Sequence, residues 1–255
     1  MKTCLLFYLI FLGTTKAFAF VILIDPGHGG KELGAVSTVI KKDKKGRKTA
    51  HKVYEKDLTL RLAKYVQKNL MGQFSVYLTR SFDRTVSLDD RASMADTVKA
   101  DLFISIHFNS ATEPDFHGFE TYYLDNHNEK AIKKVESIEN KDLTGEDKII
   151  NQILIDLVVG KTVKSSKKLA ELIHGKVGRN IKGFKRKDRG IKPGLFYVLA
   201  LSKRPGVLIE GGFMSNPKEI FQLKSDNYLK AYAKGISQGI IDFYKSSPKR
   251  DIPLF

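Results

Sequence analysis

Short runs of continuous apolar residues alternate along the chain with segments whose apolar residues recur at helical spacing. Residues 20–24 are apolar throughout and are followed at once by Asp25-Pro26-Gly27. This pattern predicts a buried strand in the middle of a sheet, ending in a turn. Residues 55–70 instead show the spacing of an amphipathic helix with one apolar stripe facing the core. That stripe consists of Leu58, Leu62, Tyr65, Val66 and Leu70.

The same two patterns predict the rest of an α/β fold with a mixed, mainly parallel sheet. Strand-like runs occupy residues 75–78, 101–107, 118–124, 194–199 and 206–210. Helical spacing occupies residues 87–99, 165–177 and 227–244. Strands and helices in alternation are typical of α/β proteins. Residues 39–51 are polar and rich in lysine, with Gly46 among them, and predict an exposed loop.

Residues 126–162 depart from this alternation because they are charged and helical in pattern. Residues 131–139 and 149–158 each predict a short amphipathic helix, with a polar turn around Gly145 between them. The whole chain has 255 residues, 42% of them apolar, which suffices for one well-buried domain. We therefore predict a single domain, residues 20–250, that carries a helical insertion at 126–162.

The first 19 residues have the pattern of a secretory signal peptide. Met1-Lys2 is a short positive start, residues 4–13 are apolar, and Ala17-Phe18-Ala19 fits a small-x-small cleavage site. The apolar run is too short for a membrane span, and an uncleaved membrane anchor is the alternative. Removal of the segment removes Cys4, the single cysteine. A metal ion in the mature chain must then be bound by His, Asp or Glu.

The formal net charge of +16 favours anionic partners such as nucleic acid, anionic lipid or an acidic wall polymer. Export argues against nucleic acid. The positive charge is scattered along the chain, apart from residues 41–48 and 182–189. We interpret it as a general attraction to an anionic matrix, and a merely solvated surface is the alternative.

Three apolar strands each run into a polar side chain that a core strand does not need: His28, His107 and Glu210. Ligands of open α/β sheets bind at the carboxyl ends of the strands. Two histidines and a glutamate with one open position form a recurring hydrolytic zinc site. Glu55, in the first turn of a predicted helix, can supply the carboxylate ligand. Glu210 is then left to take a proton from water.

Spacing alone leaves other interpretations of these residues open. The compact H-E-x-x-H motif is absent, so the ligands must come from separate elements. The glycines around His28 match neither a phosphate-binding loop nor a dinucleotide fingerprint. Each histidine could instead be a hydrogen-bonded core or turn residue.

Five motifs, in this order, resemble the type 3 family of zinc-dependent N-acetylmuramoyl-L-alanine amidases. They are VILIDPGHGG at 21–30, YEKD at 54–57, LTR at 78–80 with Asp83, SIHFN at 105–109 and VLIEGGFMSN at 207–216. The resemblance extends from about residue 21 to residue 244. It implies a phosphorylase/hydrolase-like twisted sheet with helices on both faces.

The resemblance also implies cleavage of the amide between N-acetylmuramic acid and the L-alanine of the stem peptide. His28, Glu55 and His107 match the family's ligands for one Zn²⁺ ion, and Glu210 matches its catalytic glutamate. Asn109 matches an asparagine that contacts substrate or forms a turn. Two arginines at family positions are expected to brace the fold through ion pairs, namely Arg80 and Arg91. The other histidines match no motif of the family: His51, His117, His127 and His174.

Residues 126–162 resemble the insertion that covers the active site of the septal members until an activator protein displaces it. Residues 138–143 resemble its glutamate-bearing helix. Glu139 lies seven residues after Ile132, in line with an apolar stripe. The resemblance implies that Glu139 plugs the metal in the resting enzyme. A plug formed by Glu136, or a Glu139 that faces solvent, are the alternatives.

We expect peptidoglycan and a displacing activator protein as partners, no nucleic acid, and a monomer. The exported chain is expected in the periplasm, with secretion to the cell wall as the alternative, and a role in wall remodelling and daughter-cell separation. Two rival functions are a zinc exopeptidase acting on envelope peptides and a wall-binding module without activity. Competent residues at all four metal and catalytic positions argue against the second.

Overall fold

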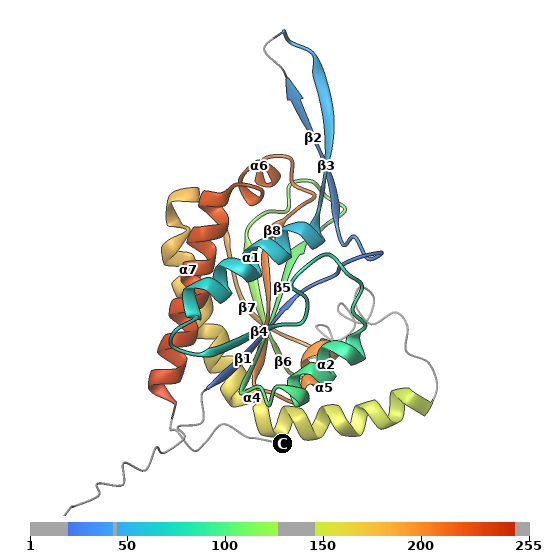
Figure 1. Cartoon of the computed structure of the whole chain (residues 1–255), viewed down its shortest axis with the longest axis vertical. Coiled ribbons are helices and arrows are strands. Elements are labelled where there is room, and N and C mark those ends of the chain that lie inside the picture. Colours follow the sequence, from blue (N-terminus) through green and yellow to red (C-terminus); the bar gives the residue numbers. More distant parts are fainter. Residues whose placement is uncertain (1–19, 43–44, 127–145, 248–255) are drawn as a thin grey trace, which may run out of the picture.

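The computed structural model describes residues 20–42, 45–126 and 146–247, and its centre is a six-stranded sheet (Figure 1). The strands lie in the order β4-β1-β5-β8-β6-β7, and only the β6–β8 pair is antiparallel. This confirms the mixed, mainly parallel sheet. The strands are β1 (Val21–Pro26), β4 (Ser75–Leu78), β5 (Leu102–Asn109), β6 (Phe119–Leu124), β7 (Asp188–Gly194) and β8 (Gly206–Phe213).

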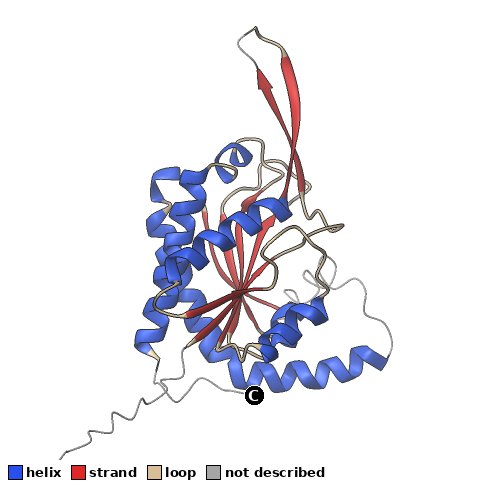
Figure 2. Ribbon diagram, viewed as in Figure 1, coloured by secondary structure: helices blue, strands red, loops and turns tan. Residues whose placement is uncertain are grey.

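Helices cover both faces of the sheet (Figure 2). One face packs against α1 (Glu55–Leu70), α7 (Asp226–Ser246) and the second half of α4 (Glu146–Asn180). The other face packs against α2 (Leu88–Thr97), α5 (Tyr197–Ser202) and the first half of α4. The short helices α6 (Glu219–Leu223) and η1 (Lys182–Phe184) complete the described helices. Among the described helices, none pairs the length with the apolar character that crossing a bilayer demands.

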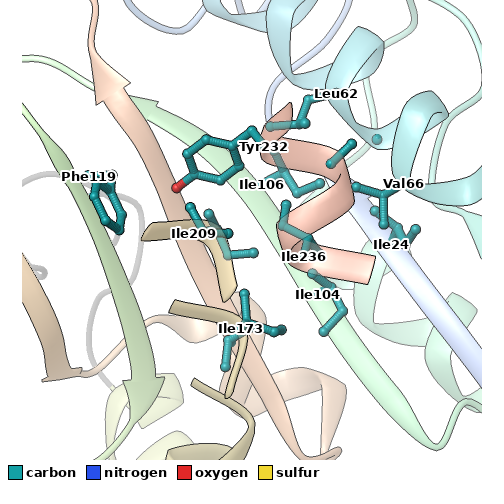
Figure 3. Close-up of a cluster of buried hydrophobic side chains, with 14 of the residues drawn as sticks. Ile24, Leu62, Val66, Ile104, Ile106, Phe119, Ile173, Ile209, Tyr232 and Ile236 are labelled. Atoms are coloured by element: carbon teal, nitrogen blue, oxygen red, sulfur yellow. The ribbon is translucent and has the colours of Figure 1, made fainter. Parts of the chain in front are cut away.

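The larger apolar core lies between the sheet and the layer formed by α1, α4 and α7 (Figure 3). Isoleucines of β1, β5 and β8 meet Leu62 of α1, Ile173 of α4 and Ile236 of α7, all fully buried. Burial of each such side chain stabilises the fold by about 1.5–3 kcal/mol. The apolar stripe of α1 therefore fixes this helix on the sheet, with its first residue, Glu55, at the carboxyl ends of the strands.

Several elements have the bounds that the sequence predicts, most closely α1 and β4. The expected exposed loop at 39–51 is wrong. These residues belong to an antiparallel hairpin of β2 (Val36–Lys42) and β3 (Lys48–Tyr54). Its outer part is exposed on both faces, so no apolar alternation marked it as strand.

Two further expectations need correction. The run at 194–199 is not a strand, because β7 ends at Gly194 and α5 begins at Tyr197. A short, fully apolar run is compatible with either a buried strand or a buried helix. The helices expected at 149–158 and 165–177 are one continuous helix, α4. The proposed signal peptide at 1–19 and the helix at 131–139 lie outside the described residues.

Helix α7 approaches α4 closely at two glycines. A Cβ atom at Gly235 would lie 2.5 Å from the Cα of Val177, and one at Gly239 would lie 2.4 Å from the Cα of Ile173. The obstructing atoms are backbone, so only movement of a whole helix could relieve the overlap. The close packing of α7 against α4 therefore depends on these glycines.

Replacing Gly235 by alanine should lower the free energy of unfolding by about 1–3 kcal/mol. Overpacking outweighs the roughly 1 kcal/mol that alanine gains over glycine in a helix. Gly175→Ala in α4 is the control, since no atom of another segment lies within 4 Å of its added Cβ. The control should be more stable than the wild type by about 0.5–1 kcal/mol. Denaturant unfolding measures both, and equal stability of the two variants would contradict the close contact.

Candidate metal centre

Four candidate side chains lie at the carboxyl edge of the sheet. His28 follows β1, His107 is on β5 and Glu210 is on β8. Glu55 is the first residue of α1, directly after β3. The convergence of His28, Glu55 and His107 follows the sequence-based expectation, and one ligand atom of each lies within 4.8 Å of the others.

The carboxylate of Glu55 lies between the two imidazoles. Its Oε2 atom is 3.1 Å from Nε2 of His28, and its Oε1 atom is 3.2 Å from Nδ1 of His107. The two rings meet edge to face with their centroids 4.9 Å apart. Bonds of about 2.0–2.1 Å in a tetrahedral arrangement place neighbouring zinc ligands about 3.3 Å apart. The donors therefore have both the chemistry and the spacing to hold one divalent ion, with a further coordination position left open.

Backbone amides fix the Glu55 carboxylate in this position. Oε2 also accepts a hydrogen bond from the N–H of Ala35 at 2.8 Å, and Oε1 accepts one from the N–H of Phe108 at 2.9 Å. Burial would raise the pKa of Glu55, but the hydrogen bonds and charges of His107 and His28 outweigh it. The pKa is held far below the usual range of a glutamate, so this carboxylate is ionised and ready to coordinate a cation.

The turn that carries His28 is braced by Arg91. His28 has a φ of 60°, a left-handed conformation that few non-glycine residues adopt and that the surrounding structure must enforce. The Arg91 guanidinium donates to the His28 carbonyl at 2.9 Å and to the Pro26 carbonyl at 3.0 Å. It also forms a buried ion pair with Asp25 at 2.5 Å. Despite burial, Arg91 and Thr79 hold the pKa of Asp25 below its usual range.

Arg80 braces the same turn through carbonyl groups. Its guanidinium is buried and donates to Pro26 at 3.0 Å and to Gly27 at 2.9 Å. Among the described residues, the expected bracing through an ion pair is therefore confirmed for Arg91, whereas Arg80 braces the turn through hydrogen bonds to carbonyl groups.

Two glycines leave room for the ligand side chains. A Cβ atom at Gly27 would lie 2.3 Å from the His107 ring, and one at Gly34 would lie 2.5 Å from the Glu55 carboxylate. Gly34 also has a φ of 66°, which favours glycine.

A pocket of about 160 Å³ opens beside the imidazoles. Its lining includes Leu88 of α2 and, from the start of α5, Phe196, Tyr197 and Val198.

Glu210 lies beside His107 in the sheet, since the two residues are register partners of β8 and β5. It is 8% exposed. Its register partner on the other side is Glu120 of β6, a fully buried carboxylate that the sequence analysis did not identify. Arg189 contacts Glu120, and the Lys192 ammonium lies 2.8 Å from it. The only sequence signal was one acidic residue inside the apolar run at 118–124.

Among the residues that the structure describes, the remaining candidates do not join the metal ligands. The side-chain oxygen of Asn109 accepts a hydrogen bond from the N–H of Ser110 at 2.8 Å, which is the contact of a turn residue. His51 is exposed in the hairpin, and His117 bonds to the nearby Asp115 carbonyl. His174 is buried, bonded to Thr121 and Asp188. His127 and Glu139 lie outside the described residues.

Comparison with known proteins gives consistent matches over nearly the whole chain. A family model described as N-acetylmuramoyl-L-alanine amidase matches residues 22–242. The chain is 30% identical over 234 residues to N-acetylmuramoyl-L-alanine amidase AmiA of Escherichia coli, covering 88% of this chain and 76% of that protein. It is 31% identical to N-acetylmuramoyl-L-alanine amidase LytC of Bacillus subtilis, covering 88% of this chain and 35% of that protein.

A solved structure of an N-acetylmuramoyl-L-alanine amidase from Clostridium difficile has a similar fold. The TM-score is 0.64 at 30% sequence identity, and the match covers 90% of this chain and 99% of that one. The similarity therefore extends over most of the chain and is not confined to a local motif.

Gly27→Ala should weaken the binding of a divalent metal ion by about 10–100-fold, the usual effect of lost ligand orientation. The added Cβ would displace the His107 imidazole from its position beside Glu55. Gly183→Ala is the control, because no heavy atom of its surroundings lies within 4 Å of the added Cβ. Competition with a metal-sensitive dye measures the affinity. Unchanged metal affinity in a folded Gly27→Ala protein would contradict this role of the glycine.

Proposed function

The chain belongs to the N-acetylmuramoyl-L-alanine amidase family, and we propose that it works through one zinc ion held by His28, Glu55 and His107. It is a peptidoglycan hydrolase that cleaves the amide between N-acetylmuramic acid and the L-alanine of the stem peptide. The observation that carries the proposal is the convergence of two imidazoles and one carboxylate from three separate elements.

Zinc bound to these donors would activate a water molecule and polarise the amide carbonyl. Glu210 is the proposed general base, because it is the register partner of His107 and carries a carboxylate to the same edge of the sheet. It would accept the proton of the attacking water and deliver it to the leaving nitrogen of L-alanine. Asn109 would contribute by shaping the turn after β5, since its side chain bonds to Ser110.

A pocket beside these residues is the proposed binding site of the stem peptide. The pocket next to the imidazoles has an apolar side formed by Leu88, Phe196 and Val198. Such a wall excludes bulk water from a reacting amide and strengthens the charge interactions around it. We propose that the leaving peptide lies along this wall, with its amide at the metal ligands.

We further propose that residues 1–19 direct export and that the mature enzyme, residues 20–250, acts in the periplasm, with the cell wall outside the membrane as the alternative. The charged segment 126–162 supports regulation at the site. In this proposal Glu139 occupies the open metal position until an activator protein displaces the segment. Much of the segment lies outside the described residues, so this proposal is supported by sequence spacing.

Purified peptidoglycan digested with and without a zinc chelator tests the function directly. Mass spectrometry should find new free amino groups on L-alanine beside intact glycan strands, and the chelator should abolish them. Release of terminal amino acids instead would favour an exopeptidase. If the wall stayed intact in both samples, the result would favour a wall-binding protein without activity.

Glu210→Gln should lower the rate of amide cleavage by about 10²–10⁴-fold, because the variant keeps the shape of the side chain but cannot accept a proton. Its zinc content should equal that of the wild type. The matched variant Glu55→Gln should instead lose the metal, since the charge between the two imidazoles is removed. Wild-type turnover by Glu210→Gln would refute its role as general base.

Glu139→Ala should raise the basal rate of wall cleavage, because the proposed plug would no longer compete with water for the metal. Glu136→Ala is the matched control and should leave that rate unchanged. Turbidity clearance of purified wall measures both. A rise in Glu136→Ala alone would assign the plug to the rival residue, and no rise in either variant would refute a carboxylate plug.

A further inference from the structure

The β2–β3 hairpin rises from the rim of the metal centre and extends beyond the body of the protein (Figure 1). Strand β3 leads directly into Glu55. Strand β2 follows Ala35, whose N–H donates to the Glu55 carboxylate. Strand β3 is therefore joined to a proposed metal ligand through the backbone, and β2 is joined to it through the hydrogen bond of Ala35. The hairpin is continuous with the candidate site.

The base of the hairpin is fixed on the body. Val39 is 2% exposed and belongs to the main apolar cluster, and the Ser37 hydroxyl donates to the Met214 carbonyl. Beyond these residues the described side chains are exposed, and Ile40 is 58% exposed. A seven-residue strand rises by roughly 3.3 Å per residue, so the outer part reaches well away from the reacting bond.

The outer part is strongly basic. Residues 36–54 contain seven lysines or arginines and one aspartate. We call five exposed residues of this part the basic arm: Lys41, Lys45, Arg47, Lys48 and Lys52. Charged residues on an exposed ribbon also prevent pairing with other strands. Lysines are common on exposed strands for that reason, but seven basic residues against one acidic residue also give this hairpin a strong positive charge.

We propose that the basic arm binds carboxylate groups of peptidoglycan stem peptides next to the one being cut. This inference rests on the proposed function and adds which residues bind the insoluble polymer. The anionic polymer and the cationic arm are complementary in charge, and several weak contacts at a distance from the metal would hold the enzyme on its substrate. A small soluble fragment, cut at the metal centre, has no neighbouring peptides for the arm to bind.

The triple variant Lys41→Gln, Lys48→Gln, Lys52→Gln tests the proposal in the full chain. All three side chains are exposed, so the fold should be unaffected. The control is Lys68→Gln, Lys230→Gln, Lys234→Gln, which removes the same charge from an exposed groove between α1 and α7. Each triple is combined with Glu210→Gln so that the wall stays intact, and binding to purified peptidoglycan is measured by co-sedimentation.

The arm variant should bind the wall about tenfold more weakly, as expected for the loss of three exposed charge contacts, and the control should bind nearly as the wild type does. With Glu210 restored, the arm variant should cut insoluble wall more slowly and a soluble disaccharide-peptide at the wild-type rate.

An equal loss of wall binding in the two triple variants would show that binding follows the net charge of the protein, and would overturn the proposal. So would a loss of binding to anionic lipid vesicles without a loss of binding to wall. Slower cutting of the soluble fragment by the arm variant would also overturn it, because the arm would then act on the metal centre. Failure of the amidase function would be seen separately, as absence of amide cleavage by the wild type, since the sedimentation assay needs no catalysis.

Discussion

One carboxylate joins the parts of the protein that form the candidate site. Glu55 contacts His28 after β1 and His107 on β5, and it accepts hydrogen bonds from the amides of Ala35 and Phe108. A buried carboxylate is costly unless its oxygens are satisfied, and here each oxygen has an amide and an imidazole. Because Glu55 begins α1, the apolar stripe that holds this helix on the sheet also sets the position of the ligand.

Other buried charges at the same edge are paired in a similar way. Asp25 is bound by Arg91, and Glu120 is bound by Arg189 and Lys192. Removing one partner of such a pair costs several kcal/mol, because the other charge stays buried. These pairs restrict the loops after β1 and the strands beside Glu210, so the donors are held in place before a metal ion or a substrate arrives.

Much of the site could be predicted because parallel strands bring their carboxyl ends to one edge, so polar residues at three strand ends had to converge. Glu55 was predictable from its place in the first turn of a strongly periodic helix. The hairpin could not be predicted over 39–51, because strands exposed on both faces lack an apolar period. The run at 194–199 was ambiguous between strand and helix because its residues after Gly194 are all apolar and so show no period. The partners of Glu120 come from a strand about 70 positions later, a pairing that no local pattern encodes.

The wide separation of the donors along the chain, from His28 to His107, ties occupancy of the centre to the integrity of the fold. An unfolded chain offers no comparable set of ligands, so an ion that selects the native state shifts the folding equilibrium by mass action. At a free ion concentration one hundred times the dissociation constant, the gain is about 2.7 kcal/mol. Metal supply in the surroundings would then govern how long each molecule survives, as well as whether it can react.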